Sequence, residues 1–316
     1  MRYDRNNMKQ KTKNIDIFNL KKETKSPRLI NKNGKLQTKE NFWQKNAGID
    51  KNTGAWMNKI LIGFPTTGLI RVEVMQSRMS QITPTNWSSV NLTQWMSSYA
   101  PLQYVLADAE NLMAKAVVEG NYEWFLSTEE DNILPVDLFV RLDEYMRECK
   151  VPIVSGLYFT KSNPPEPMTY RGRGTGSFQD FKLGDKVWCD GTAMGCTLIH
   201  GSIIRALWNE SPEYVVNGQV TRRVFDNTPK QFGKPEDGKF ATTSGTTDLA
   251  FYTRIMENDI FRKAGWPEYS KKKYPFLVDT NILVSHITQS GIKYPLFMPQ
   301  KYLPLPKKLK KGERLK

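Results

Sequence analysis

Three consecutive acids, Glu129, Glu130 and Asp131, follow the apolar run Trp124–Thr128 and come shortly before Pro135. Alternate residues of an extended chain point to the same side, which would place the carboxylates of Glu129 and Asp131 together and that of Glu130 opposite them. Carboxylate oxygens suit Mg²⁺ or Mn²⁺, ions that commonly bridge to a substrate's phosphates. The alternative is that the acids stabilise the start of a helix near Pro135, where negative charge is favoured by about 0.3–1 kcal/mol.

The chain has two histidines, His200 and His286, which excludes a zinc site built from three histidines. His286 ends the apolar run that begins at Phe276, where its imidazole could join the acids on a metal. Mn²⁺ accepts such mixed oxygen and nitrogen ligands more readily than Mg²⁺ does. The alternative for His286 is a buried, hydrogen-bonded histidine, and we expect His200 to be of that structural kind.

Asp248 opens a helical pattern after the segment Ser244–Thr247. Its carboxylate could act as a general base, or it could only cap the helix. The glycines between Arg171 and Gly176 match neither the dinucleotide-binding nor the Walker A spacing, and the chain has no GxSxG motif. The sequence therefore indicates neither a glycine-rich phosphate-binding loop nor a serine nucleophile.

Strands and helices are expected to alternate around these residues. The apolar runs predict strands, and spacings of three and four predict helices. The strands are expected at Ile60–Phe64, Tyr122–Thr128, Val151–Phe159, Thr192–Ile199 and Phe276–His286, and the helices at Tyr104–Val118, from Pro135, at Ile203–Trp208 and at Thr247–Met256. This order predicts an α/β fold with a mainly parallel central sheet flanked by helices. Ligands of such sheets bind at the carboxyl ends of the strands, where the acids lie.

The formal charge of +14 lies at the two ends of the chain. Residues 1–50 carry 13 Lys and Arg against 5 Asp and Glu, and residues 301–316 carry 7 against 1. We therefore expect a basic arm over 1–55, a folded domain over 56–295 and a basic tail over 296–316. A nucleic-acid-binding domain would carry its basic patch on the folded body. The tails could still contact nucleic acid or an anionic surface non-specifically, or they could be solvated termini.

Three cysteines, Cys149, Cys189 and Cys196, form no CxxC pair and leave one over under any pairing. Neither a disulfide framework nor a zinc site is indicated, and a reducing cytoplasm fits best. No signal peptide is visible. No apolar run approaches the roughly 20 residues that span a bilayer, so we expect no transmembrane segment.

In their order, these segments resemble family 2 glycosyltransferases of the GT-A fold, particularly the short bacterial and phage forms. The resemblance covers roughly residues 59–290 and includes neither end of the chain. It rests on "ILIGFPTTG", "EED" before "NILP", "VPIVSGLYFTKSNPPEP", the glycine-bearing "TAMGCTLI", "TTDLAF" and "VDTNILVSH".

The resemblance implies a GT-A fold, a nucleotide-sugar donor, Mn²⁺ or Mg²⁺ as cofactor, and transfer to an acceptor hydroxyl with inversion at the anomeric carbon. It also implies a cytoplasmic enzyme, in the host cytoplasm if a phage encodes it. The acceptor, whether polysaccharide, lipid, protein or modified DNA, is left open. The implied sites are Asp248 as catalytic base, Glu129, Asp131 and His286 as metal ligands, and Pro65, Thr66, Thr67, Glu129, Asp131 and Gly195 at the nucleotide sugar.

Three positions depart from the family pattern. Glu129 replaces an aspartate, Thr247 a glutamate, and Glu110 an arginine that could contact phosphate. Two other functions remain open: a nucleotidyltransferase on a similar fold, which would release pyrophosphate, or a catalytically degenerate protein that binds partners through its basic tails.

Overall fold

The computed structural model describes residues 58–84, 87, 94–172, 176–226, 230–232, 241–243 and 246–304. All of them belong to the larger of the chain's two compact units, Lys39–Lys316. The basic arm expected over 1–55 and residues 305–316 of the expected tail lie outside the described residues. Among the described residues, none of the helices has the length and apolar character needed to cross a bilayer.

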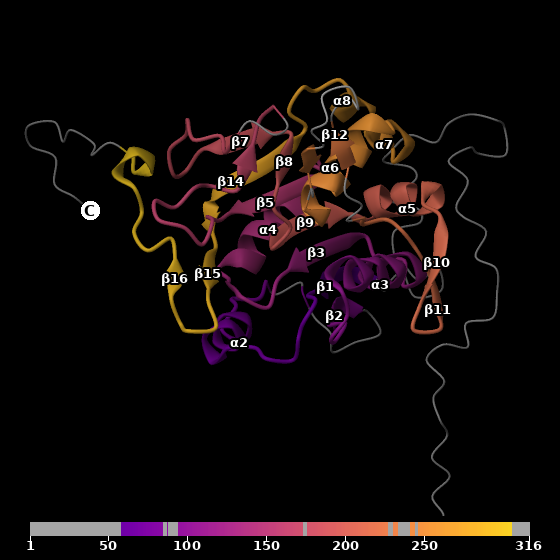
Figure 1. Cartoon of the computed structure of the whole chain (residues 1–316), viewed down its shortest axis with the longest axis horizontal. Coiled ribbons are helices and arrows are strands. Elements are labelled where there is room, and N and C mark those ends of the chain that lie inside the picture. The colour runs from indigo at the N-terminus through magenta and orange to yellow at the C-terminus, as the bar shows by residue number, and fades with distance from the viewer. Residues whose placement is uncertain are drawn as a thin grey trace, which may run out of the picture. The chain divides into compact units, whose positions relative to one another are not determined.

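A seven-stranded sheet forms the centre of the domain (Figure 1). Its order is β2 (Gln94–Tyr99), β1 (Asn58–Gly63), β3 (Trp124–Thr128), β9 (Cys196–His200), β5 (Ile153–Leu157), β14 (Phe276–Leu283) and β7 (Lys186–Cys189). Strands β2, β1, β3, β5 and β14 point the same way, and β9 and β7 run antiparallel to their neighbours. The predicted mainly parallel sheet is confirmed. Its central strands are apolar on both faces because both faces are covered.

Helices pack on the two faces of the sheet through alternate side chains of each strand. Phe125 of β3 belongs to the core on one face, and its neighbours Trp124 and Leu126 belong to the core on the other. The first core is completed by α3 (Leu106–Glu119), α5 (Gly201–Glu210), α6 (Thr247–Glu257) and α7 (Ile260–Lys263), and the second by α4 (Leu138–Glu148). The other helices among the described residues are α2 (Val72–Met79), α8 (Pro267–Ser270) and the 3₁₀ helix η2 (Gln300–Tyr302).

Four small sheets surround the central one. A three-stranded ladder joins β16 (Lys293–Tyr294), β15 (Ser285–Ile287) and β4 (Asn132–Ile133). Two-stranded pairs are formed by β10 (Glu213–Val216) with β11 (Gln219–Arg222), β12 (Lys230–Phe232) with β13 (Ala241–Thr243), and β6 (Thr169–Tyr170) with β8 (Gly191–Thr192). The ladder of β4 and β15 matters most, because it joins the acidic segment to the strand carrying the late histidine.

Two expected boundaries are corrected by the structure. Helix α4 begins at Leu138 and not at Pro135, because residues 132–133 first pair as β4 with β15. The folded body extends past residue 295 into the expected tail. Tyr302 is fully buried there, with its ring stacked on Phe181 at a centroid distance of 4.9 Å. An aromatic side chain in an otherwise basic segment was the sequence signal for this packing.

Candidate active site

The acidic segment is a turn at the carboxyl end of β3. Strand β3 ends at Thr128, and the Asn132 amide donates to the Glu129 carbonyl at 3.3 Å. Strand β4 then pairs with β15 so that Asn132 lies opposite His286. One potential ligand atom each from Glu129, Asp131 and His286 lies within 4.8 Å of the others. The structure therefore brings together the three residues that the sequence predicts as metal ligands, through a turn and not through an extended strand.

His286 is oriented as a metal-binding histidine would be. Its Nδ1 lies 2.7 Å from the Phe159 carbonyl, and because a carbonyl only accepts, Nδ1 carries the hydrogen and donates it. In the neutral ring Nε2 then presents its lone pair, and it lies 3.7 Å from the Glu129 carboxylate. The ring also meets Tyr158 edge to face. His286 is thus buried and hydrogen-bonded, as a structural histidine would be. Its Nε2 nevertheless faces the acids.

Glu130 points away from this group, as the sequence predicts. Its carboxylate accepts hydrogen bonds from the Thr66 hydroxyl at 2.7 Å, the Thr67 amide at 2.7 Å and the Thr67 hydroxyl at 2.9 Å. Thr66 and Thr67, with Pro65, form the loop after β1 that the sequence assigns to the nucleotide. Glu130 therefore fixes that loop beside the acidic turn.

Asp248 lies in the first turn of α6, where Thr246 caps the helix by accepting from the Leu249 amide. The Asp248 carboxylate is buried and accepts from the Met194 amide at 3.3 Å. Burial, and after it the negative charge of Glu129, raises the pKa of Asp248 to about 7. A carboxylate that exchanges its proton near neutral pH is suited to general base catalysis.

A further buried carboxylate, Glu110 on α3, was not predicted as a site residue. It is 3% exposed, and its Oε2 has no hydrogen-bond partner among the described residues. Burial, and after it the charge of Asp248, raises the pKa of Glu110 well above its usual range. The sequence indicated only that Glu110 replaces an arginine of the resembled family. The replacement puts a carboxyl that burial keeps protonated where the resembled family has a positive charge beside Asp248.

Two cations border the acidic turn, and sequence reasoning missed both. Lys161, in the loop after β5, forms an ion pair with Asp131. Arg78 on α2 donates to the Thr128 hydroxyl at 3.0 Å and to the Glu129 carbonyl at 2.7 Å. Burial lowers the pKa of Arg78 to about 10, still far enough above neutral pH to keep it charged. Arg78 thus positions the turn, whereas Lys161 pairs with the charge of Asp131.

Gly195 lies where a side chain would fill the site. A Cβ atom there would collide with the Asn132 amide and approach the Glu129 Oε2 to 2.7 Å. The Gly195 carbonyl accepts from the Asn132 side chain at 2.7 Å, and its amide donates to the Tyr158 hydroxyl. The residue predicted to contact the nucleotide sugar is therefore next to the predicted metal ligands, and only glycine leaves room there.

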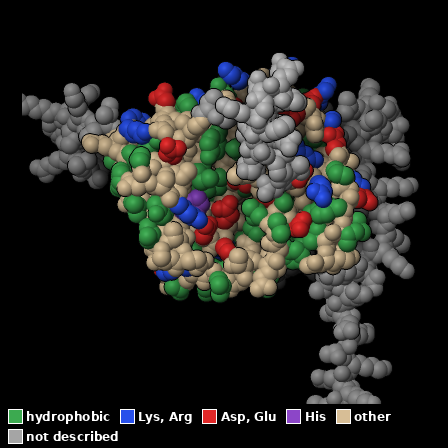
Figure 2. All heavy atoms as spheres, in the orientation of Figure 1, with side chains coloured by type: hydrophobic (Ala, Val, Ile, Leu, Met, Phe, Trp, Pro, Cys, Tyr) green, Lys and Arg blue, Asp and Glu red, His purple; other side chains and the backbone are tan. Residues whose placement is uncertain are grey.

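The acidic side chains gather near the middle of one face of the molecule, with a histidine and basic side chains beside them (Figure 2). Two carboxylates and an imidazole nitrogen form a donor set that suits Mn²⁺, and also suits Mg²⁺ with water completing the shell. The oriented nitrogen of His286 and the excess of carboxylates both fit a bound divalent cation. The site lies at the carboxyl ends of β3 and β5, where open α/β sheets bind their ligands.

No family model and no curated protein matches the chain. Among solved structures, A197 from STIV is similar with a TM-score of 0.43 and 12% identity, over 73% of this chain and 86% of A197. TarS 1-349 from S. aureus, solved with UDP-GlcNAc, is similar with a TM-score of 0.32 and 12% identity, over 49% of this chain and 48% of that fragment. A Bacillus anthracis protein described as a glucose-1-phosphate thymidylyltransferase, solved with sucrose, is similar with a TM-score of 0.28 and 13% identity, over 49% of this chain and 76% of that protein.

This chain thus spans about half of the TarS fragment. Similarity at these TM-scores describes a related arrangement of elements and carries no conclusion about activity. The function must therefore be inferred from the site itself.

Proposed function

We propose that the protein is a metal-dependent glycosyltransferase that moves a sugar from a nucleoside-diphosphate donor to an acceptor hydroxyl. The observation that carries the proposal is the convergence of Glu129, Asp131 and an oriented His286 beside a buried Asp248. An oxygen-rich cation site and a carboxylate with its pKa raised to about 7 are the two parts that such a transfer needs.

In this proposal Asp131, His286 and Glu129 hold Mn²⁺ or Mg²⁺, which would neutralise charge on the leaving nucleoside diphosphate. Asp248 accepts the proton of the acceptor hydroxyl, whose oxygen attacks the anomeric carbon as the bond to the diphosphate breaks. A single in-line displacement of this kind inverts the configuration at that carbon.

The donor's remaining contacts are assigned to the loop after β1 and to Gly195. Thr66 and Thr67 are held by Glu130, so their backbone is already ordered next to the metal ligands. Lys161 leaves Asp131 when a metal binds and offers its ammonium to the diphosphate. A preorganised loop of this kind reduces the entropy lost on donor binding.

The proposal is tested by incubating a panel of sugar nucleotides with the full chain and Mn²⁺, and measuring the products released. Release of a nucleoside diphosphate is expected, with large losses in Asp131→Ala and Asp248→Asn. Pyrophosphate as the product would assign the site to a nucleotidyltransferase. Unaltered rates in both variants would overturn the assignment of these residues.

A further inference from the structure

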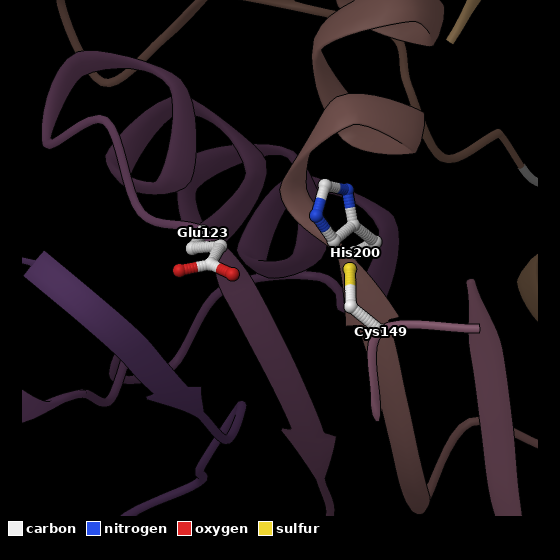
Figure 3. Close-up of side chains that lie close together, drawn as sticks. All are labelled: Glu123, Cys149 and His200. Atoms are coloured by element: carbon white, nitrogen blue, oxygen red, sulfur yellow. The ribbon is translucent and has the colours of Figure 1, made fainter. Parts of the chain in front are cut away.

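A second group of potential metal ligands lies at the opposite edge of the central sheet. Glu123 directly precedes β3, Cys149 is the C-terminal cap of α4 just before β5, and His200 ends the antiparallel β9. All three therefore lie at the amino ends of the parallel strands, whereas the candidate active site lies at their carboxyl ends (Figure 3).

The backbone holds these three segments side by side. The Gly201 amide donates to the Glu123 carbonyl at 2.6 Å, and the His200 amide donates to the Pro152 carbonyl at 2.8 Å. Trp124 and His200 are paired across β3 and β9. Glu123 and His200 are thus positioned by the sheet, and Cys149 by the end of α4, where its amide donates to the Tyr145 carbonyl at 2.9 Å.

One ligand atom each from Glu123, Cys149 and His200 lies within 4.8 Å of the others. Figure 3 shows the sulfur of Cys149 directed towards the imidazole, with the Glu123 carboxylate beside both. His200 and Glu123 are buried, at 0% and 6% exposed, and Cys149 is half-buried. An ion would reach the group from the Cys149 side and would then be largely withdrawn from water.

His200 has a neighbour that would orient it towards a metal. Its Nδ1 accepts from the Ser202 amide at 3.3 Å and lies 2.8 Å from the Ser202 hydroxyl. The same hydroxyl accepts from the Trp266 indole at 3.0 Å. A metal on Nε2 requires the proton on Nδ1, which would then donate to the Ser202 oxygen in place of the contact with the Ser202 amide.

Glu123 forms an ion pair with Lys59, which compensates one carboxylate charge through Oε2. Carboxylates that bind metals commonly accept such a second contact. With the Cys149 thiolate and the Glu123 carboxylate as ligands and Lys59 beside them, a bound divalent ion would leave one net positive charge at the site. The thiol proton is released to solvent on binding.

We propose that Glu123, Cys149 and His200 form a Zn²⁺ site that joins β3, β9 and the α4–β5 connection. Thiolate, imidazole and carboxylate together match the ligands that zinc takes, and a water completes four-coordination. Magnesium and manganese prefer oxygen and are expected at the other edge. Because its ligands come from three segments at the start or end of strands, the proposed role of the site is to fix the sheet's amino edge.

The test uses Co²⁺ as a spectroscopic substitute for Zn²⁺ on the metal-free full chain. A sulfur-to-cobalt charge-transfer band in the near ultraviolet is expected, and Zn²⁺ should remove it by displacement. The oxygen-rich site cannot produce this band because it contains no thiol. The band should disappear in Cys149→Ala and persist in the control Cys189→Ala, whose thiol is fully buried on β7.

The variant Glu123→Gln distinguishes metal binding by all three residues from metal binding by Cys149 alone. It should keep the sulfur band but weaken Co²⁺ binding by roughly 10-fold or more. Circular dichroism of each variant establishes that it is folded. The proposal is overturned if the native chain shows no sulfur band, if the band survives in Cys149→Ala, or if Glu123→Gln binds Co²⁺ as tightly as the native chain.

Discussion

The two edges of the central sheet carry different ligand chemistry. The carboxyl edge gathers carboxylates and His286, with loops and partly exposed cations around them, whereas the amino edge gathers a thiol, His200 and Glu123 between buried strands. Hard divalent ions and phosphates suit the first set, and zinc suits the second. In α/β sheets the carboxyl edge binds substrates. In the two proposals, one scaffold keeps a reaction site and a structural site apart by separating their ligand types.

The largest expected effect concerns the base at the carboxyl edge. Asp248→Asn should lower sugar-nucleotide turnover by roughly 10²- to 10⁴-fold, because asparagine cannot accept the acceptor's proton. The dissociation constant of the donor should change little, because the proposed role is in the chemical step. Steady-state kinetics and donor titration measure both. Cys149→Ala, at the amino edge, is the matched control and should retain the native rate. An equal loss of turnover in Cys149→Ala would show that the two edges do not differ in function.

The same carboxylate gives the carboxyl edge a distinct pH dependence of stability. The raised pKa of Asp248 means that the folded state holds a proton between about pH 4 and 7 that the unfolded state has lost. Stability from this group is therefore present at low pH and lost as the pH rises through about 7. In the metal-free protein, the free energy of unfolding of Asp248→Asn should increase relative to that of the native chain by up to roughly 4 kcal/mol between pH 4 and pH 8.

Urea unfolding of both proteins at the two pH values measures this difference. The pH 4 pair is the internal control, because at that pH the native carboxyl is mostly protonated when folded. A variant that loses stability relative to the native chain as the pH rises would contradict the electrostatic account of Asp248.

A smaller effect is expected from closing the space beside the metal ligands. Gly195→Ala places a methyl group against the Asn132 amide and the Glu129 carboxylate. Overpacking of this kind typically costs about 1–3 kcal/mol. We expect weaker Mn²⁺ and donor binding, measured by calorimetry. Gly218→Ala on the β10–β11 turn is a control for loss of stability alone, because at a φ of +77° the added atom strains the backbone but meets nothing within 4 Å. Binding that survives Gly195→Ala unchanged would place the donor elsewhere.

The smallest effect concerns the lysine that pairs with Asp131. Both side chains are partly exposed, and such pairs contribute about 0.2–1 kcal/mol. Lys161→Met should therefore strengthen Mn²⁺ binding in the absence of nucleotide by about 1.5- to 5-fold. It should weaken the affinity for a nucleoside diphosphate, which would lose the ammonium. Weaker binding of Mn²⁺ itself would show that Lys161 does not compete for Asp131.

Much of the fold was predictable because buried parallel strands leave long apolar runs in the sequence. The strands containing Leu61, Phe125 and Val154 and the helices containing Met113 and Phe251 were found in this way. Strand β2 and helix α2 were missed, since the segment Gln94–Tyr99 contains no long apolar run and Val72–Met79 exposes several of its apolar side chains.

The candidate metal ligands of the carboxyl edge were predictable because Glu129 and Asp131 are only two residues apart, and because His286 is one of only two histidines and follows a long apolar run. Lys161, Arg78 and Glu110 were not, because only the tertiary fold brings them to the acidic turn. The amino-edge group was missed for the same reason. Cys149 and His200 are far apart in sequence, and no short spacing links either of them to Glu123.

The most direct measurement is Mn²⁺ binding to the full chain, followed by electron paramagnetic resonance, in the native protein, Asp131→Ala and Cys149→Ala. We predict that the native chain and Cys149→Ala bind Mn²⁺ equally, and that Asp131→Ala binds it more weakly by on the order of 100-fold. Addition of a nucleoside diphosphate should strengthen binding in the first two proteins only. Equal Mn²⁺ affinity in all three, or a loss in Cys149→Ala alone, would contradict a catalytic metal at the carboxyl edge of the sheet.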